Sequence, residues 1–173
     1  MTTAGTAAAA PARRVWLRIG LVAVAAIELY DAVTSMHNIF TDYHHDTAYL
    51  RFAQTLTSVD LALAPAVSGA ALLLAVIGRT RLAILALAAL ALLLWLLRDI
   101  WSIPVHGLEI AWSYGGQVAL FDHVVFPAAA IAGAVLALKD RRLALAGFLV
   151  SVPTLYNWIG VVIFTIGIMI YGF

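Results

Sequence analysis

The chain alternates between five apolar stretches and short polar segments. A helix needs about 20 apolar residues to cross the hydrocarbon core of a membrane, and each stretch comes close to that length. We expect spans at about 15–35, 57–77, 82–103, 118–138 and 150–171, after a low-complexity tail, 1–12, that is expected to be disordered. The pattern therefore predicts an all-α, polytopic membrane protein: one transmembrane domain, 13–173, folded as a five-helix bundle.

Composition agrees with this interpretation. Hydrophobic residues make up 64% of the 173 residues and charged residues 11%, whereas soluble domains have about 45–50% and about 25%. The net charge is +1 and the chain has no cysteine. Nucleic acid is therefore not an expected partner, and disulfides and thiolate metal sites are excluded.

Basic residues lie in alternate loops. They precede or begin the first span and occupy the second and fourth loops, as Arg13, Arg14, Arg18, Arg79, Arg81, Lys139, Arg141 and Arg142. The first and third loops hold a single arginine, Arg51, among acids and histidines. By the positive-inside rule we expect the N-terminus in the cytoplasm and the C-terminus outside, in the cytoplasmic (inner) membrane of a cell.

Acidic residues interrupt the apolar stretches at similar depths. A carboxylate at the centre of a spanning helix costs ~2.5–3.5 kcal/mol on insertion scales, so such residues are functional candidates. At a rise of about 1.5 Å per residue, all of them fall in the outer half of the membrane. The candidate catalytic groups are these acids and one histidine: Glu28, Asp31, Asp60, Asp99, Asp122 and His123.

Glu28 and Asp31 form the closest acidic pair. They are three residues apart and therefore lie on one face of a helix. Two carboxylates that close in an apolar site do not both ionise easily, so we expect one to hold a proton near neutral pH. Such a pair suits general acid–base catalysis or a proton relay. The alternative is a structural pair that a neighbour such as Arg98 neutralises.

Two prolines follow acidic positions within the spans. Pro127 leaves the carbonyl of His123 without its helical donor, and Pro65 does the same to Leu61. Backbone of this kind is tolerated at membrane depth where it lines a cavity. The prolines therefore favour a polar cavity beside the acids, although prolines are also common in membrane helices that lack one.

Four further residues are candidate binding residues. Arg98 either neutralises an acid across the bundle or extends to the outer headgroups. Tyr156 and Asn157 lie in a polar part of the last span, where they either reach the acids or join helices by hydrogen bonds. We expect that span to be strongly tilted or broken at Pro153. Trp101 completes the set.

The histidines offer nitrogen ligands for a metal, although their spacing matches no recognised signature. The candidate ligands on the outer side are His37, His44, His45 and His106. A haem needs two axial ligands that face each other, and only His123 lies clearly within a span. The sequence requires no cofactor and leaves metal binding open.

Three functions follow from this pattern, all within a lipid bilayer. The first is a small integral-membrane enzyme that performs acid–base chemistry on a lipophilic small molecule, in a carboxylate- and histidine-lined pocket open to the outer face. The second is a cation or proton transporter that uses the same acids, although the inner halves of the spans are apolar. The third is an accessory subunit of a larger respiratory or photosynthetic membrane complex. Surfaces around Gly133, Gly160 and Gly167 suit packing between helices or between copies in a homo-oligomer.

Overall fold

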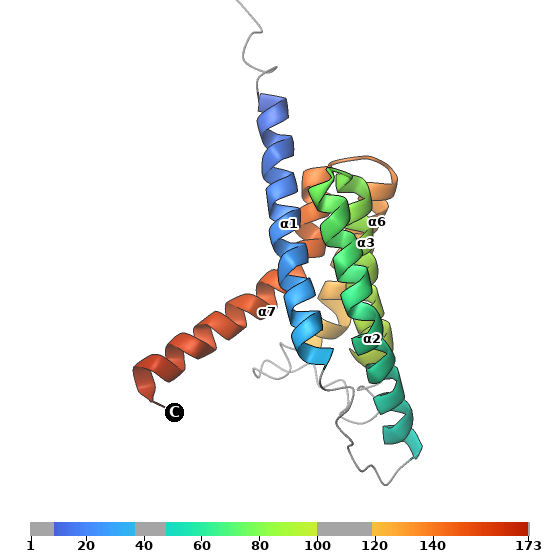
Figure 1. The fold of residues 1–173 in the computed structure, drawn as a ribbon, viewed down its shortest axis with the longest axis vertical. Coiled ribbons are helices and arrows are strands. Elements are labelled where there is room, and N and C mark those ends of the chain that lie inside the picture. The colour runs from blue at the N-terminus through green and yellow to red at the C-terminus, as the bar shows by residue number, and fades with distance from the viewer. Residues whose placement is uncertain (1–8, 37–47, 100–118, 173) are drawn as a thin grey trace, which may run out of the picture.

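The computed structural model describes residues 9–36, 48–99 and 119–172, and these residues are helical with short turns between helices. Its elements are α1 (Ala9–Ser35), α2 (Ala48–Val76), α3 (Thr80–Leu94) with the π-helix η2 (Trp95–Asp99), the π-helix η4 (Phe121–Val125) with α6 (Phe126–Leu138), and α7 (Leu143–Tyr171) (Figure 1). Within the described residues there is no β-strand, so the predicted all-helical fold is confirmed.

Four helices of the described part are long and apolar enough to cross a membrane. They cover Gln54–Val76, Thr80–Leu97, Phe121–Leu138 and Leu143–Tyr171. These four agree with the second to fifth predicted spans and indicate a membrane protein. α1 has the length of a span but carries Arg18, Glu28 and Asp31 among its apolar residues, so its apolar runs are shorter than those of the other four.

The helices pack in the order in which they occur along the chain. α1 packs on α2, α2 on α3, α3 on α6, and α6 on α7, while α7 also contacts α1 and α3. Their shared core consists of aliphatic and small side chains, including Leu21, Ala75, Ile84 and Val150. The cluster draws side chains from all five α-helices of the described part.

Small residues set the closest approach between helices. A Cβ atom added to Gly133 would lie 2.6 Å from Val150 Cγ1, and one added to Gly147 would lie 2.8 Å from Leu17 Cδ1. Gly133 is therefore a packing residue between α6 and α7, as its sequence context predicts. A Cβ on Gly160 or Gly167 would have no atom of the described chain within 4 Å.

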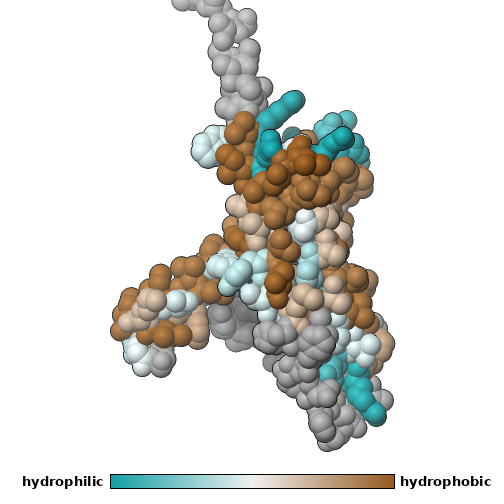
Figure 2. Space-filling model, viewed as in Figure 1, coloured by the Kyte–Doolittle hydropathy of each residue, from teal (hydrophilic) through white to brown (hydrophobic). Residues whose placement is uncertain are grey.

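Charged side chains gather at one end of the helices, at the turns between α2 and α3 and between α6 and α7 (Figure 2). Arg18 Nε donates to the Ala75 carbonyl at 3.2 Å, and its Nη2 donates to the Val76 carbonyl. Arg81 Nη2 donates to the Leu138 carbonyl at 2.8 Å. Both arginines thus bind carbonyls at a helix C-terminus, where the helix dipole favours a cation.

The last helix bends away from the others. α7 is continuous through Pro153, so the predicted break is not present. Its C-terminal half leaves the other helices in an oblique direction (Figure 1), and an internal proline is a common cause of such a bend. Most side chains of this half are exposed, including Phe164 (68%) and Met169 (80%). A helix half that is apolar on all sides needs lipid or another chain around it.

Candidate functional site

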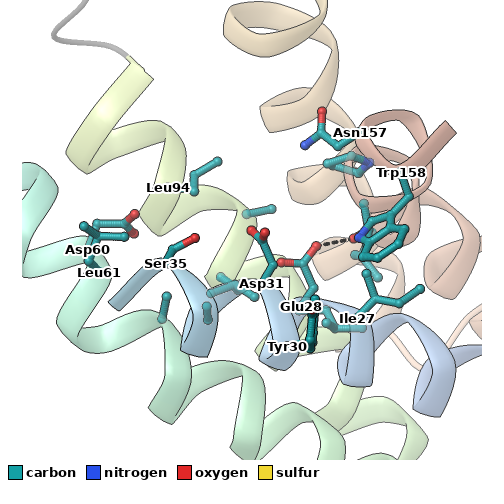
Figure 3. Close-up of a pocket in the computed structure, with 18 of the residues that line it drawn as sticks. Ile27, Glu28, Tyr30, Asp31, Ser35, Asp60, Leu61, Leu94, Asn157 and Trp158 are labelled. Atoms are coloured by element: carbon teal, nitrogen blue, oxygen red, sulfur yellow. Dashed lines mark hydrogen bonds between the residues drawn. The ribbon is translucent and has the colours of Figure 1, made fainter. Parts of the chain in front are cut away.

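A cavity of about 430 Å³ lies between α1, α2, α3 and α7. Its volume is within the range of small-molecule sites, which is about 300–1,000 Å³. Three acidic side chains line it, namely Glu28 and Asp31 from α1 and Asp60 from α2 (Figure 3). The structure thus brings together three of the six residues that the sequence marked as catalytic candidates.

Glu28 joins α1 to α7. The hydroxyl of Thr154 donates a hydrogen bond to Glu28 Oε1 (Figure 3). Thr154 is 5% exposed and directly follows Pro153 in α7. The hydrogen bond therefore holds the carboxyl group of Glu28 in a set orientation at the edge of the cavity.

Asp31 lies one helical turn beyond Glu28 and lines the same cavity. In Figure 3 its carboxyl group is next to that of Glu28, on the side of α1 that faces the cavity. Asp31 is more exposed than Glu28. The cavity is therefore lined by the half-buried carboxyl group of Glu28 and the more exposed carboxyl group of Asp31.

Asp60 reaches the cavity from α2 on the other side of Ser35 (Figure 3). Its side chain is 1% exposed, which makes it one of the most deeply buried polar groups in the described residues. A carboxyl group is rarely buried to this extent unless it has a partner or a function. Asp60 adds a third acid to the cavity, from a second helix.

The rest of the lining is mostly apolar, with two aromatic side chains, Tyr30 and Trp158, and the amide of Asn157. Among the described residues that line the cavity there is no lysine, arginine or histidine. Aliphatic side chains complete the wall: Ile27, Leu61, Leu87, Leu90, Leu94, Val150 and Val161. The cavity thus has mostly apolar walls, and its described polar groups are three carboxyl groups together with neutral hydroxyl, amide and indole groups.

Asp122 and His123 are not among the residues that line this cavity. They lie in η4, which packs on η2. Trp95 Nε1 donates to the His123 carbonyl at 3.2 Å. The carbonyl that Pro127 deprives of its helical donor is therefore bound by an indole, and does not open into the cavity that the acids of α1 and α2 line.

Tyr156 takes part in an aromatic cluster. Its ring stacks on Phe121 at 5.0 Å between centroids and meets Phe126 edge-on at 5.3 Å. Those contacts tie α7 to η4 and α6, and Tyr156 does not line the cavity. Of the adjacent pair proposed from the sequence, Asn157 is the member that lines it.

Several predicted site residues lie outside the described residues, namely Trp101, His37, His44, His45 and His106. Arg98 and Asp99 belong to η2, but their side chains are also outside the description. Within the described ranges, no group of three or more His, Asp and Glu side chains is arranged to hold a metal ion. The three cavity acids thus surround a space without converging on one point.

Thr154 and Trp158 are site residues that the sequence did not single out. A threonine in an apolar helix usually bonds its own backbone, as Thr165 does with the Val161 carbonyl at 2.8 Å. The available signal was the position of Thr154 beside Pro153, at a depth similar to that of Glu28.

The sequence matches no protein-family model and no curated protein, and the fold matches no solved structure. The functional conclusion therefore rests on the chemistry of the cavity.

Proposed function

We propose that this chain is a small integral-membrane enzyme that performs acid–base chemistry on a lipophilic small molecule bound in the cavity. Glu28 and Asp31 exchange protons with this molecule. One observation carries the proposal: two carboxyl groups one helical turn apart line the same cavity, whose walls are mostly aliphatic. Small-molecule sites have this composition, with apolar walls and a few well-placed polar groups.

The reaction class is a proton shift within the ligand. Two neighbouring carboxyl groups in an apolar site share a proton more readily than they carry two charges. The ionised member accepts a proton from one atom of the ligand, and the protonated member delivers a proton to another atom. The ligand keeps its atoms and its electrons, so the step needs no co-reactant.

Thr154 and Asp60 support this pair. The hydrogen bond from Thr154 orients the carboxyl group of Glu28, as a catalytic acid or base requires. Asp60, 1% exposed, adds a fixed acidic group on the far side of the cavity. Asp122 and His123 receive no role in the proton shift, because they do not line the cavity.

We further propose that α1 is the fifth span and that the basic end of the helices faces the cytoplasm, as the positive-inside rule expects. The chain then begins inside, ends outside and lies in the cytoplasmic membrane. Glu28 lies about 15 Å along α1 from Arg18, at 1.5 Å per residue. The cavity then extends outward from near the membrane centre and receives its ligand from the bilayer or the outer face.

The buried core argues against the transporter alternative. Transport needs access to the site from both faces of the membrane. Leu21, Ala75, Ile84 and Leu87 are at most 2% exposed and belong to the apolar core that lies toward the basic end. Among the described residues, the buried polar side chains toward that end are Ser68 and Ser151, whose hydroxyls donate to carbonyls of their own helices, and neither of them is charged.

One observation favours the accessory-subunit alternative. The C-terminal half of α7 is apolar, exposed and separate from the other helices. A partner subunit or a second copy would cover it, although lipid covers such a surface equally well. Isolation of the chain in a large stable complex would favour this function over an enzyme that works alone.

A deuterium-exchange assay tests the proposed function. The purified protein, in lipid nanodiscs, is incubated in D₂O with an organic-solvent extract of the cells that produce it. We expect mass spectrometry to find at least one lipophilic component that gains carbon-bound deuterium only when the protein is present. No gain over a protein-free control would contradict the proposal.

Ala91→Phe provides a cavity-blocked variant for this assay, because Ala91 lines the cavity. Ala89→Phe is its matched control, since Ala89 is on the same helix but its side chain is exposed and does not line the cavity. We expect exchange to be lost in Ala91→Phe and kept in Ala89→Phe. Equal exchange in both variants would place the reaction outside the cavity.

A further inference from the structure

Neutral hydrogen-bond donors lie on α7 where this helix borders the cavity. Asn157 and Trp158 line the cavity, and Figure 3 shows them on α7, across from the carboxyl groups that α1 carries. The amide of Asn157 has two N–H donors and the indole of Trp158 has one. No hydrogen bond within the described residues engages either side chain. Both side chains are therefore available to a ligand.

The contact between Glu28 and Thr154 sets the level of these donors relative to the acids. α1 and α7 both run away from the basic end of the helices (Figure 1), and Thr154 donates to Glu28 Oε1. Asp31 lies one helical turn, about 4.5 Å, beyond Glu28 along α1. Asn157 lies the same distance, about 4.5 Å, beyond Thr154 along α7. The acid and the amide thus border the same part of the cavity.

These donors favour a ligand that carries a hydrogen-bond acceptor. A purely hydrocarbon ligand in the cavity would shield the N–H groups of Asn157 and Trp158 from water and offer them no acceptor, which is unfavourable. A ligand with one oxygen acceptor satisfies them, while the aliphatic walls of the cavity cover the rest of the molecule. The ligand is therefore apolar over most of its length and has an oxygen at one position.

The proposed proton shift narrows the chemistry of that oxygen. A carboxylate is a weak base and removes a proton from carbon only where the electron pair left behind moves onto a neighbouring group. Because the step uses no co-reactant, that group belongs to the ligand. A carbonyl group next to the C–H bond accepts the electron pair, and negative charge develops on its oxygen. Fixed N–H donors in a site that excludes water stabilise such a charge strongly.

We propose that the ligand of this cavity is a lipophilic ketone or aldehyde, whose carbonyl oxygen accepts hydrogen bonds from Asn157 and Trp158. This inference rests on the proposed function and names the class of its substrate. The ionised carboxyl group of the acidic pair takes a proton from the carbon beside the carbonyl. The electrons of that C–H bond form a C=C bond, and the C=O electron pair moves onto oxygen. The protonated carboxyl group then delivers a proton to the same carbon or, in an unsaturated ligand, to another carbon, and the C=O bond forms again.

The deuterium-exchange assay, run on a chemically blocked extract, tests the class of the ligand. Hydroxylamine converts ketones and aldehydes into oximes. One portion of the cell extract is treated with hydroxylamine and freed of excess reagent before it is incubated with the protein in nanodiscs and D₂O. We expect carbon-bound deuterium to be gained in the untreated portion and not in the treated one. Equal gain in both portions overturns the inference but leaves the proposed function, whereas gain in neither portion overturns both.

Single substitutions test the two donors. Asn157→Leu removes the amide donors at an exposed position, and Trp158→Phe keeps an aromatic ring without an N–H. We expect each to slow exchange about a hundredfold, as the loss of one oxyanion donor does. Thr165→Val and Trp16→Phe are the matched controls, because the Thr165 hydroxyl bonds its own helix and Trp16 is 72% exposed. Slower exchange in either donor variant than in its control supports the inference, and control rates in both variants overturn it.

A model ketone shows whether these donors bind the carbonyl oxygen itself. The probe is 2-decalone with ¹³C at the carbonyl, whose infrared C=O stretching frequency falls when the oxygen accepts hydrogen bonds. We expect a lower frequency in nanodiscs that contain the protein than in empty nanodiscs, and loss of this shift in Asn157→Leu. Asp140→Asn should keep the shift, because Asp140 is exposed in the turn between α6 and α7. No shift with the wild-type protein, or the same shift in Asn157→Leu, overturns the inference.

Discussion

The indole Nε1 of Trp95 donates a hydrogen bond of 3.2 Å to the carbonyl oxygen of His123. In an α-helix the donor to this carbonyl would be the N–H of residue 127, which is a proline and has none. The bond joins η2 to η4, two π-helical segments that pack on each other. π-Helical turns often occur where a helix adapts to a neighbour or a site. Here a side-chain N–H from η2 binds a backbone carbonyl of η4.

Trp95→Phe should destabilise the protein. It removes the donor and leaves a part-buried carbonyl unsatisfied, which costs about 1–3 kcal/mol. Thermal unfolding in detergent, followed by near-ultraviolet circular dichroism, measures the loss. Trp16→Phe is the matched control, because Trp16 is 72% exposed. Equal melting temperatures for the two variants would show that the bond contributes nothing.

Removing Thr154 should affect both stability and activity. Thr154→Val keeps the shape of the side chain but removes the donor to Glu28 Oε1. We expect a loss of about 1–3 kcal/mol, typical of a buried acceptor that loses its donor, together with slower deuterium exchange. Thr154→Ser keeps the hydroxyl donor and should therefore keep both the stability and the exchange rate. Thr165→Val is the control, since the Thr165 hydroxyl bonds its own helix, and a similar loss there would remove the special role of Thr154.

Two glycine-to-alanine substitutions should have opposite effects. Gly133→Ala places a Cβ 2.6 Å from Val150 Cγ1 and 3.0 Å from the Ala146 carbonyl, so we expect a loss of about 1–3 kcal/mol from overpacking. Gly160→Ala meets no atom within 4 Å and should gain about 0.5–1 kcal/mol from helix propensity. Unfolding in detergent measures both. Equal stability would mean that α6 and α7 do not approach closely at Gly133.

Arg18 should stabilise the C-terminus of α2. Arg18→Met keeps most of the apolar stem but removes the donors to the carbonyls of Ala75 and Val76, and we expect a loss of roughly 0.5–2 kcal/mol. Arg14→Met, one turn earlier on α1 and also exposed, should lose less. The free energies of unfolding of the two variants are compared in low and in high salt. A larger effect of Arg14→Met would contradict this role.

The helices could be predicted from the sequence because long apolar runs between polar turns have few alternative structures. The depth of each acid followed from its position in a run. The direction in which each acid points around its helix could not be predicted, because a span can rotate about its axis without changing its hydropathy. Asp122 was therefore grouped with Glu28, although only Glu28 lines the cavity.

Tyr156 and Asn157 show the same limit at adjacent positions. Neighbouring residues point about 100° apart on a helix, so only one of the two could face the acids. The structure places Asn157 on the cavity and Tyr156 against Phe121. This rotation depends on packing between helices, which hydropathy does not record.

The central claim is that Glu28 and Asp31 act as one acid–base unit. Deuterium exchange into the lipophilic substrate, measured for Glu28→Gln, Asp31→Asn and the double variant, tests it most directly. Residues that act as a unit are strongly non-additive. We therefore expect each single variant to lose nearly as much rate as the double variant, while Asp140→Asn keeps the full rate. Wild-type exchange in either single variant, or losses that simply multiply in the double variant, would contradict the claim.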